Sequence, residues 1–336
     1  MYYHGNSRSG FLNSICSRAT EGQIYFKELC SWAKYTLFLL YLLYISELFK
    51  SQPPLVRGPD LARGPPVENP CYRPIVSIED QLALQSDINS LFEWSKIWDL
   101  DFNAKKCVIL NVATRKRHHV PAYNYQLAGH SLAKVDQQGD LGIMVSNNLS
   151  WKFHIKHMIC KANRILGMIR HTCSDIYDIQ TRKILYLAHV RPILEYSSEI
   201  WNPITKCLVS DIERVQRRAT RFILRSSIPY EDRLKELSLL SLEQRRRLKD
   251  NILFFKGIHD LTSLDVDGKT TFRSSNSYTL RSSDCLSLIP NFCKTTIFKQ
   301  TYFNRIYKSW NDIPNGLRNL ANPLHFKNQL LEYYSN

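Results

Sequence analysis

A chain of 336 residues, 44% of them hydrophobic, is long enough for one large domain or two smaller ones with buried cores. Its formal net charge of +15 predicts an anionic partner, either nucleic acid or an anionic membrane surface. The alternative is that the charge only keeps the protein soluble. The nine cysteines are odd in number, irregularly spaced and without a CxxC pair. This pattern argues against a disulfide framework or a zinc ribbon, so we expect no disulfide partner and an intracellular location, in the nucleus or the cytoplasm.

The first 76 residues differ in composition from the rest and are expected to be a disordered or independent region of unrelated origin. Their apolar segment at residues 35–45, YTLFLLYLLYI, is shorter than the roughly 20 residues that a membrane-spanning helix needs. It predicts a buried or interfacial helix, and membrane association is the alternative. Residues 51–74 are rich in Pro, Gly and Arg, which predicts an extended linker.

Residues 77–150 predict a small α/β unit. A helix is expected over residues 82–98, because its apolar residues recur on one helical face: Leu84, Ile88, Leu91, Phe92 and Trp98. A strand at residues 107–112, a hairpin around Ala128-Gly129 with runs 125–127 and 132–135, and a strand at residues 141–145 are expected to follow.

Residues 151–260 predict a helical unit. Its first helix, from His154, carries an apolar stripe of Ile155, Met158, Ile159, Ala162, Leu166 and Ile169. Further helices are expected at residues 179–189, 211–225 and 242–259. Residues 261–336 predict a polar loop, to about residue 287, and closing helices at 302–310 and 325–334. The fold class expected from this order is α+β and helix-rich.

The helix at residues 211–225 gives the sharpest functional signal. At about 100° per residue, five arginines fall on one face, opposite Ile212, Val215, Ala219 and Phe222. We call them the arginine stripe: Arg214, Arg217, Arg218, Arg221 and Arg225. Guanidinium groups match phosphate geometry, and like charges one turn apart repel unless an anion is present. The stripe therefore predicts a nucleic-acid contact, with a solvated basic face as the alternative. A second predicted contact lies at the start of the next helix: Arg245, Arg246 and Arg247.

Candidate metal ligands are weak. His154, His157 and Cys160 recur every three residues, but this spacing drifts around a helix and no fourth ligand lies nearby, so we predict no metal site. Cys107 and Cys160 are expected to be core residues. The sequence contains no Ser-His-Asp order, phosphate loop or HExxH motif.

Five segments, in order, resemble the region after the active site in reverse transcriptases of retrotransposons without long terminal repeats, of the jockey and chicken-repeat type. They are LQSDINSLFEWSKIWDLDFNAKKC, DLGIMVSNNLSWKFHIKHMICKANRILGMIR, ILYLAHVRPILEYSSEIWNP, IERVQRRATRFIL and YFNRIYKSWNDIP. The resemblance covers residues 79–335. It implies that residues 77–150 are a palm remnant with primer-grip-like strands, and that residues 151–260 are a thumb-like unit that holds template and primer. Lys106 matches the palm lysine near the incoming triphosphate, with Asn103 in the same turn, although Ala104 stands where proline is usual.

One departure from the family is decisive for activity. Polymerases of this type hold two Mg²⁺ ions with two adjacent aspartates and a third upstream. The pair is expected a few dozen residues before Trp94, where this chain has the linker, whose only aspartate is Asp60. Glu79-Asp80 is too close to the helix and resembles its first turn. We therefore expect a truncated, catalytically inactive derivative of an RNA-directed DNA polymerase that binds RNA or DNA without sequence specificity and carries no cofactor.

Three alternatives stay open at this point. The chain could form an active polymerase when another chain completes it. It could be a basic protein that residues 35–45 attach to a membrane. It could also be an open reading frame without a selected role.

Overall fold

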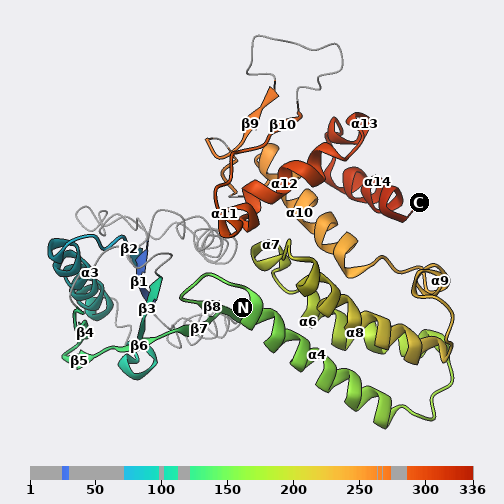
Figure 1. The fold of residues 1–336 in the computed structure, drawn as a ribbon, viewed down its shortest axis with the longest axis horizontal. Coiled ribbons are helices and arrows are strands. Elements are labelled where there is room, and N and C mark those ends of the chain that lie inside the picture. Colours follow the sequence, from blue (N-terminus) through green and yellow to red (C-terminus); the bar gives the residue numbers. More distant parts are fainter. Residues whose placement is uncertain are drawn as a thin grey trace, which may run out of the picture. The chain divides into compact units, whose positions relative to one another are not determined.

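The computed structural model of the chain describes residues 25–29, 72–97, 102–112, 122–262, 264–266, 268–273 and 286–335. The described residues up to Ser150 belong to one compact unit and those from Trp151 onward to a second. The fold is α+β and helix-rich, as the sequence predicts (Figure 1). The apolar segment 35–45 and residues 51–71 of the predicted linker lie outside the described residues.

A small parallel sheet forms the centre of the first unit. Its strand order is β2 (Tyr72–Arg73), β1 (Tyr25–Leu29), β3 (Val108–Val112) and β6 (Ala133–Val135). Strand β1 pairs with β3 over its whole length, from Tyr25 opposite Val108 to Leu29 opposite Val112. Strands β1 and β2 are not predicted from the sequence, whereas β3 falls where a strand is expected.

Helix α3 (Ile78–Ile97) supplies the core of this unit. Leu84 and Ile88 are fully buried, and they belong to one apolar cluster with Cys107, Ile109 and Tyr125. This confirms the apolar face predicted for the helix, apart from Trp98, which lies outside the described residues.

Two short hairpins complete the unit. Strands β4 (Gln126–Leu127) and β5 (His130–Ser131) pair with each other, and so do β7 (Gln137–Asp140) and β8 (Ile143–Ser146). Both two-residue turns have positive φ at both positions, 52° and 79° at Ala128-Gly129 and 46° and 82° at Leu141-Gly142. Such turns match the twist of a hairpin, and they explain the glycine at each second position. The predicted hairpin at Ala128-Gly129 is confirmed, but its second strand is His130–Ser131, and residues 133–135 form β6 of the parallel sheet instead.

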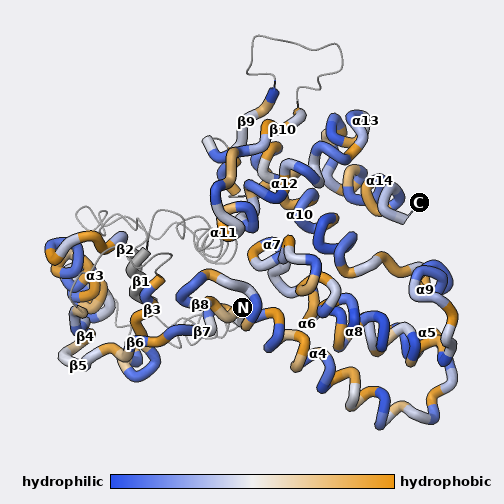
Figure 2. The backbone as a smooth tube through the Cα atoms, viewed as in Figure 1, coloured by the Kyte–Doolittle hydropathy of each residue, from blue (hydrophilic) through white to orange (hydrophobic). Residues whose placement is uncertain are grey.

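Three long helices organise the second unit: α4 (Lys152–Thr172), α8 (Lys206–Leu224) and α10 (Leu242–Ile258). Apolar and polar residues alternate along α4 and α8 in Figure 2. The apolar stripe predicted for α4 is buried except for the half-buried Ile159. Cys160 is exposed, so the prediction that it is a core residue is wrong. It stands two residues from both Met158 and Ala162, which at about 100° per residue places it on the opposite face.

Between α4 and α8 the chain forms α5 (Ile179–Leu185), the π-turn η2 (Tyr186–Val190), α6 (Arg191–Glu195) and α7 (Ser198–Trp201). The π-turn directly precedes α6, which has Pro192 in its first turn. Proline has no backbone N–H, and its ring crowds the preceding turn of an α-helix. A wider turn before it relieves this conflict without ending the helical run.

The C-terminal part packs on α10. It contains β9 (Thr271–Phe272), β10 (Leu288–Ile289), α11 (Thr296–Gln300), α12 (Tyr302–Asn311), α13 (Asn315–Arg318) and α14 (Pro323–Ser335). Phe254, Phe255, Trp310, Phe326 and Leu330 form the centre of its core. Helix α9 (Tyr230–Glu236), which precedes α10, packs on α8 instead. Strand β9 interrupts the loop predicted at residues 261–287, of which residues 263, 267 and 274–285 lie outside the described part. Its antiparallel partner β10 follows that loop directly. Within the described ranges, no helix combines the length and the apolar character that a membrane crossing requires.

Candidate nucleic-acid interface

The arginine stripe lies on the exposed side of α8. All five of its arginines are exposed, whereas Ile212, Val215, Ala219 and Ile223 on the other side are fully buried. The helical spacing predicted this division, although Phe222, predicted on the packed side, is half-buried and Ile223 is the buried residue there. A second detail differs, because α8 ends at Leu224 and Arg225 follows as a left-handed C-cap with φ 49°.

The first two arginines of the stripe have partners on the protein. Arg214 lies 3.2 Å from the carboxylate of Asp211, one turn earlier on the same helix. Arg217 lies over the ring of Tyr230, with 4.9 Å between its guanidinium carbon and the ring centroid. Both arginines remain exposed, so these contacts orient the guanidinium groups without covering them.

Of the three remaining arginines of the stripe, Arg225 has contacts with other residues of the protein, whereas Arg218 and Arg221 differ from it. Arg225 lies over the ring of Tyr177 at 4.3 Å and donates a hydrogen bond to the carbonyl of Ser174. Arg218 and Arg221 have no ion pair or hydrogen bond with any residue that the structure describes. Their charges are therefore the ones most available to an anion.

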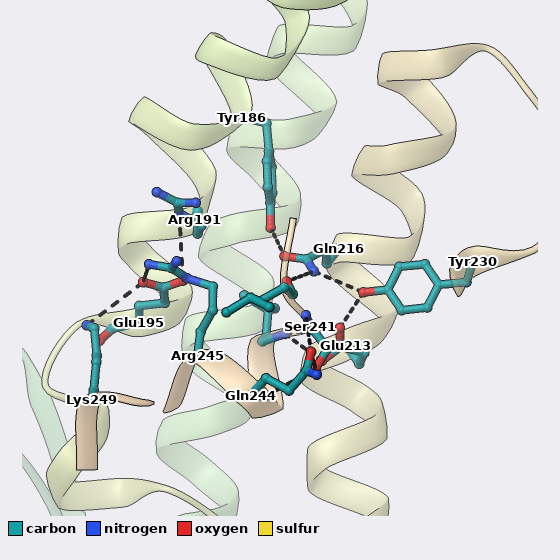
Figure 3. A network of polar contacts seen from close by, with 12 residues as sticks. Tyr186, Arg191, Glu195, Glu213, Gln216, Tyr230, Ser241, Gln244, Arg245 and Lys249 are labelled. Carbon is teal, nitrogen blue, oxygen red and sulfur yellow. Dashed lines mark hydrogen bonds and ion pairs between the residues drawn. The ribbon is translucent and has the colours of Figure 1, made fainter. Parts of the chain in front are cut away.

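A buried polar network holds the other side of α8 (Figure 3). Gln216, 1% exposed, accepts a hydrogen bond of 2.6 Å from the Tyr186 hydroxyl and donates one of 3.0 Å to the Tyr230 hydroxyl. Tyr230 in turn donates to the carboxylate of Glu213, which also accepts from the backbone N–H of Leu242. Burial and the adjacent Glu213 charge raise the pKa of Tyr230. These hydrogen bonds connect α8 to η2, α9 and the start of α10. They therefore fix the position of the helix that carries the stripe.

A buried arginine holds the C-terminal end of α8. Arg182 of α5, 1% exposed, donates hydrogen bonds of 3.2 Å to the carbonyls of Phe222 and Ile223. These carbonyls are among those that a helix end leaves without an internal partner. A cation there also complements the helix dipole. The sequence gives no local signal for this role, because Arg182 lies 40 residues away from Phe222.

Of the three arginines predicted to contact nucleic acid at the start of α10, only some are accessible to an anion. Arg245 makes a two-pronged ion pair with the buried carboxylate of Glu195, with 2.9 Å between Nη2 and Oε2. Arg191 and Lys249 also lie near this carboxylate, at 3.7 and 3.9 Å (Figure 3). Three cations thus surround the Glu195 carboxylate, and the charge of Arg245 is paired with it inside the protein.

The prediction for Arg246 requires correction. Its side chain is fully buried, and its Nε donates a hydrogen bond of 3.0 Å to Asn202. Consecutive helical residues point about 100° apart, so the three arginines cannot share one face. Arg247 is the exposed one, and it forms a 2.7 Å ion pair with Glu243.

The residues matched to the palm belong to the first unit, whereas the stripe belongs to the second. Asn103 caps the short 3₁₀ turn η1 (Ala104–Lys106), and its Oδ1 accepts a 3.1 Å hydrogen bond from the N–H of Lys105. Lys106 is exposed directly before Cys107, which is buried as predicted. The matched lysine is therefore the last residue of η1, two residues before β3 begins.

The predicted drift of His154, His157 and Cys160 around α4 is observed. His154 is buried, whereas His157 and Cys160 are exposed. His154 packs near the ring of Trp201, with 5.4 Å between centroids, and burial lowers its pKa to about 4. Among the described residues, no group of three or more His, Cys, Asp or Glu could hold a metal ion.

The positive charge is concentrated in the second half of the chain. Residues 151–336 contain 30 of the 45 lysines and arginines but only 17 of the 30 acids, a net charge of +13 out of +15. The five stripe arginines are part of this excess, which strengthens the attraction of an anion to α8 over distances of about a Debye length.

No protein-family model matches the chain, and no solved structure does. A Caenorhabditis elegans protein described as uncharacterized is 28% identical to it over an alignment of 118 residues, and the match covers 33% of this chain. The chain spans 57% of the length of that curated relative, whose name states no activity.

Proposed function

We propose that the chain binds the phosphate backbone of RNA or DNA through the arginine stripe, without reading base sequence. We further propose that it derives from the late palm and thumb part of a reverse transcriptase of a retrotransposon without long terminal repeats. The resemblance of five ordered segments supports the derivation. The observation that carries the binding proposal is the exposure of all five arginines on a helix whose other side is buried.

The chemistry of the stripe suits the phosphates of a nucleic-acid strand. Guanidinium groups donate paired hydrogen bonds to phosphate oxygens, and their spacing along a helix allows several to contact one strand. Contacts to phosphate carry no base information, so unrelated sequences should bind equally well. Each contact releases counterions, so the affinity should fall as salt rises.

The salt dependence of binding tests this proposal. Fluorescence anisotropy of the full chain with labelled, unstructured RNA and DNA oligonucleotides gives the dissociation constant at each salt concentration. Changing Arg217, Arg218 and Arg221 to Gln removes three charges and leaves the buried side of α8 untouched. The plot of log affinity against log salt should then become shallower by about two units, at about 0.7 per phosphate contact for single strands.

A matched variant controls for the loss of net charge. Changing Lys105, Lys134 and Lys327 to Gln removes three exposed cations outside the stripe and should leave the slope nearly unchanged. An unchanged slope in the stripe variant, with its circular dichroism intact, would remove the stripe from the interface. Flotation with phosphatidylserine vesicles addresses the alternative, a membrane surface; vesicle binding that the stripe variant loses, without nucleic-acid binding in the wild type, would favour a lipid partner.

A further inference from the structure

A large groove lies beside the arginine stripe within the second unit. It has a volume of about 1290 Å³ and is lined by residues of α8, α9, α10, α11, α12 and α14. Pockets for small molecules usually enclose about 300 to 1,000 Å³, so this groove is suited to a longer ligand. Arg217 belongs both to the stripe and to the groove wall, which makes the two surfaces continuous.

Exposed cations line the groove from five helices. They are Lys206, Arg217, Lys235, Arg247, Lys299 and Lys308. Two of the acids in the same wall are buried and already bonded: Glu213 accepts from Leu242, and Asp250 accepts from Arg305 at 2.9 and 3.0 Å. These two carboxylates therefore do little to offset the exposed cations.

Among the described residues, Arg247 is the one exposed groove cation that forms an ion pair with an acid of the groove wall, Glu243. Their side chains are 48% and 44% exposed, and exposed pairs of this kind contribute little stability. A phosphate can therefore replace Glu243 as the partner of Arg247 at small cost. The groove thus offers positions for several phosphates along its length.

Aromatic rings in the groove point to a ligand with bases. Tyr307 of α12 and Tyr334 of α14 line it and are half-buried. The Tyr230 ring is held by Glu213 and Gln216 and carries the Arg217 guanidinium over it, at 4.9 Å. Bases stack on tyrosine rings and on guanidinium planes. A groove with cations and such platforms suits an unpaired strand, because the bases of a duplex are stacked inside and cannot reach them.

We propose that this groove binds an unpaired stretch of RNA or DNA, with phosphates on its cations and a base stacked on Tyr307. The inference rests on the proposed function and adds a preference for single strands over duplexes. The stripe holds the backbone of either form, and the groove accepts only a strand whose bases are free.

The test compares one oligonucleotide as a single strand and in a blunt duplex, measured by fluorescence anisotropy with the full chain. Tyr307→Leu keeps an apolar side chain on α12 and removes the stacking surface. Single-strand binding should weaken by roughly 5- to 150-fold, while duplex binding stays the same. Phe292→Leu, at an aromatic position that is 83% exposed and outside the groove wall, is the matched control and should change neither.

An abasic single strand, which has sugars and phosphates but no bases, separates stacking from charge. The wild type should bind it more weakly than the ordinary strand, and Tyr307→Leu should cause no further loss. An equal loss on single strand and duplex, or no loss on the single strand by a folded variant, overturns the inference. A different result contradicts the proposed function: the variant with Arg217, Arg218 and Arg221 changed to Gln would show the same salt dependence of binding as the wild type.

Discussion

The guanidinium group of Arg305 donates two hydrogen bonds to the carboxylate of Asp250, from Nε at 3.0 Å and from Nη2 at 2.9 Å. Both side chains are buried, with 6% and 4% exposed, and they join α12 to α10. Asn202 donates a third hydrogen bond to this carboxylate, at 2.8 Å, and Arg246 donates to the same Asn202. Asp250 is therefore the acid at the centre of a polar cluster that connects α7, α10 and α12.

Arg305→Met should destabilise the second unit strongly. The variant leaves the Asp250 carboxylate buried without its cation, and breaking a buried pair in this way costs about 3–5 kcal/mol. Urea unfolding followed by circular dichroism measures the loss. Lys96→Met breaks the exposed pair with Glu93, whose side chains are 58% and 68% exposed, and should cost under about 1 kcal/mol. Equal effects of the two variants would contradict a structural role for the buried pair.

Acid should destabilise the fold through His154. Burial lowers the pKa of His154 from 6.5 to about 4, so the unfolded chain binds its proton more readily than the folded chain. The contribution of this group to stability is fully present above pH 6.5 and is lost as the pH falls toward 4, by roughly 3 kcal/mol in all. His154→Phe should flatten the pH dependence of the unfolding free energy in this window. His130→Gln, at an exposed histidine, should leave this pH dependence unchanged. If His154→Phe keeps the pH dependence of the wild type, other groups cause it.

Removing charge from the stripe should stabilise the free protein at low salt. Arg218 and Arg221 have like-charged neighbours one turn away, and such pairs destabilise a helix. Arg218→Gln with Arg221→Gln keeps the contacts of Arg214 and Arg217, and Gln is as compatible with a helix as Arg is. Differential scanning calorimetry should give a higher Tm than that of the wild type, and the difference should vanish near 1 M salt, where the Debye length is about 3 Å. A lower Tm at low salt would mean that these arginines have partners within the fold.

The purified chain should not extend a primer on an RNA template with Mg²⁺ and deoxynucleoside triphosphates. The reason is the sequence, which contains no two adjacent aspartates. Gel analysis beside an active reverse transcriptase as the positive control detects any product. Extension by the wild type that persists in Lys106→Ala would reveal an active centre elsewhere in the chain.

Periodic patterns predicted the parts of the fold that depend on local spacing. The buried face of α3 with Leu84 and Ile88, the stripe of α4 and the exposed side of α8 all follow from residues three and four apart. The same reasoning shows why Cys160 faces outward, two residues from its apolar neighbours.

Features set by distant partners were beyond this reasoning. The burial of Arg246 depends on Asn202, 44 residues earlier, and Arg182 reaches carbonyls 40 and 41 residues later. Strand β1 depends on pairing with β3, far along the chain. The groove cations are likewise spread over five helices, and no local motif brings them together.

The π-turn at Tyr186–Val190 has a consequence for how relatives of this chain should differ from it. A π-turn arises when a helix gains one residue, and the extra residue changes the angular phase of the two flanking helical segments by about 100°. In this chain the phase change lets Arg182 face the end of α8 while Glu195 faces Arg245. A homologue that lacks one residue between these positions would have a continuous α-helix there. It could keep only one of these two contacts, so gaps in this stretch should coincide with substitutions at Arg182 or at Glu195.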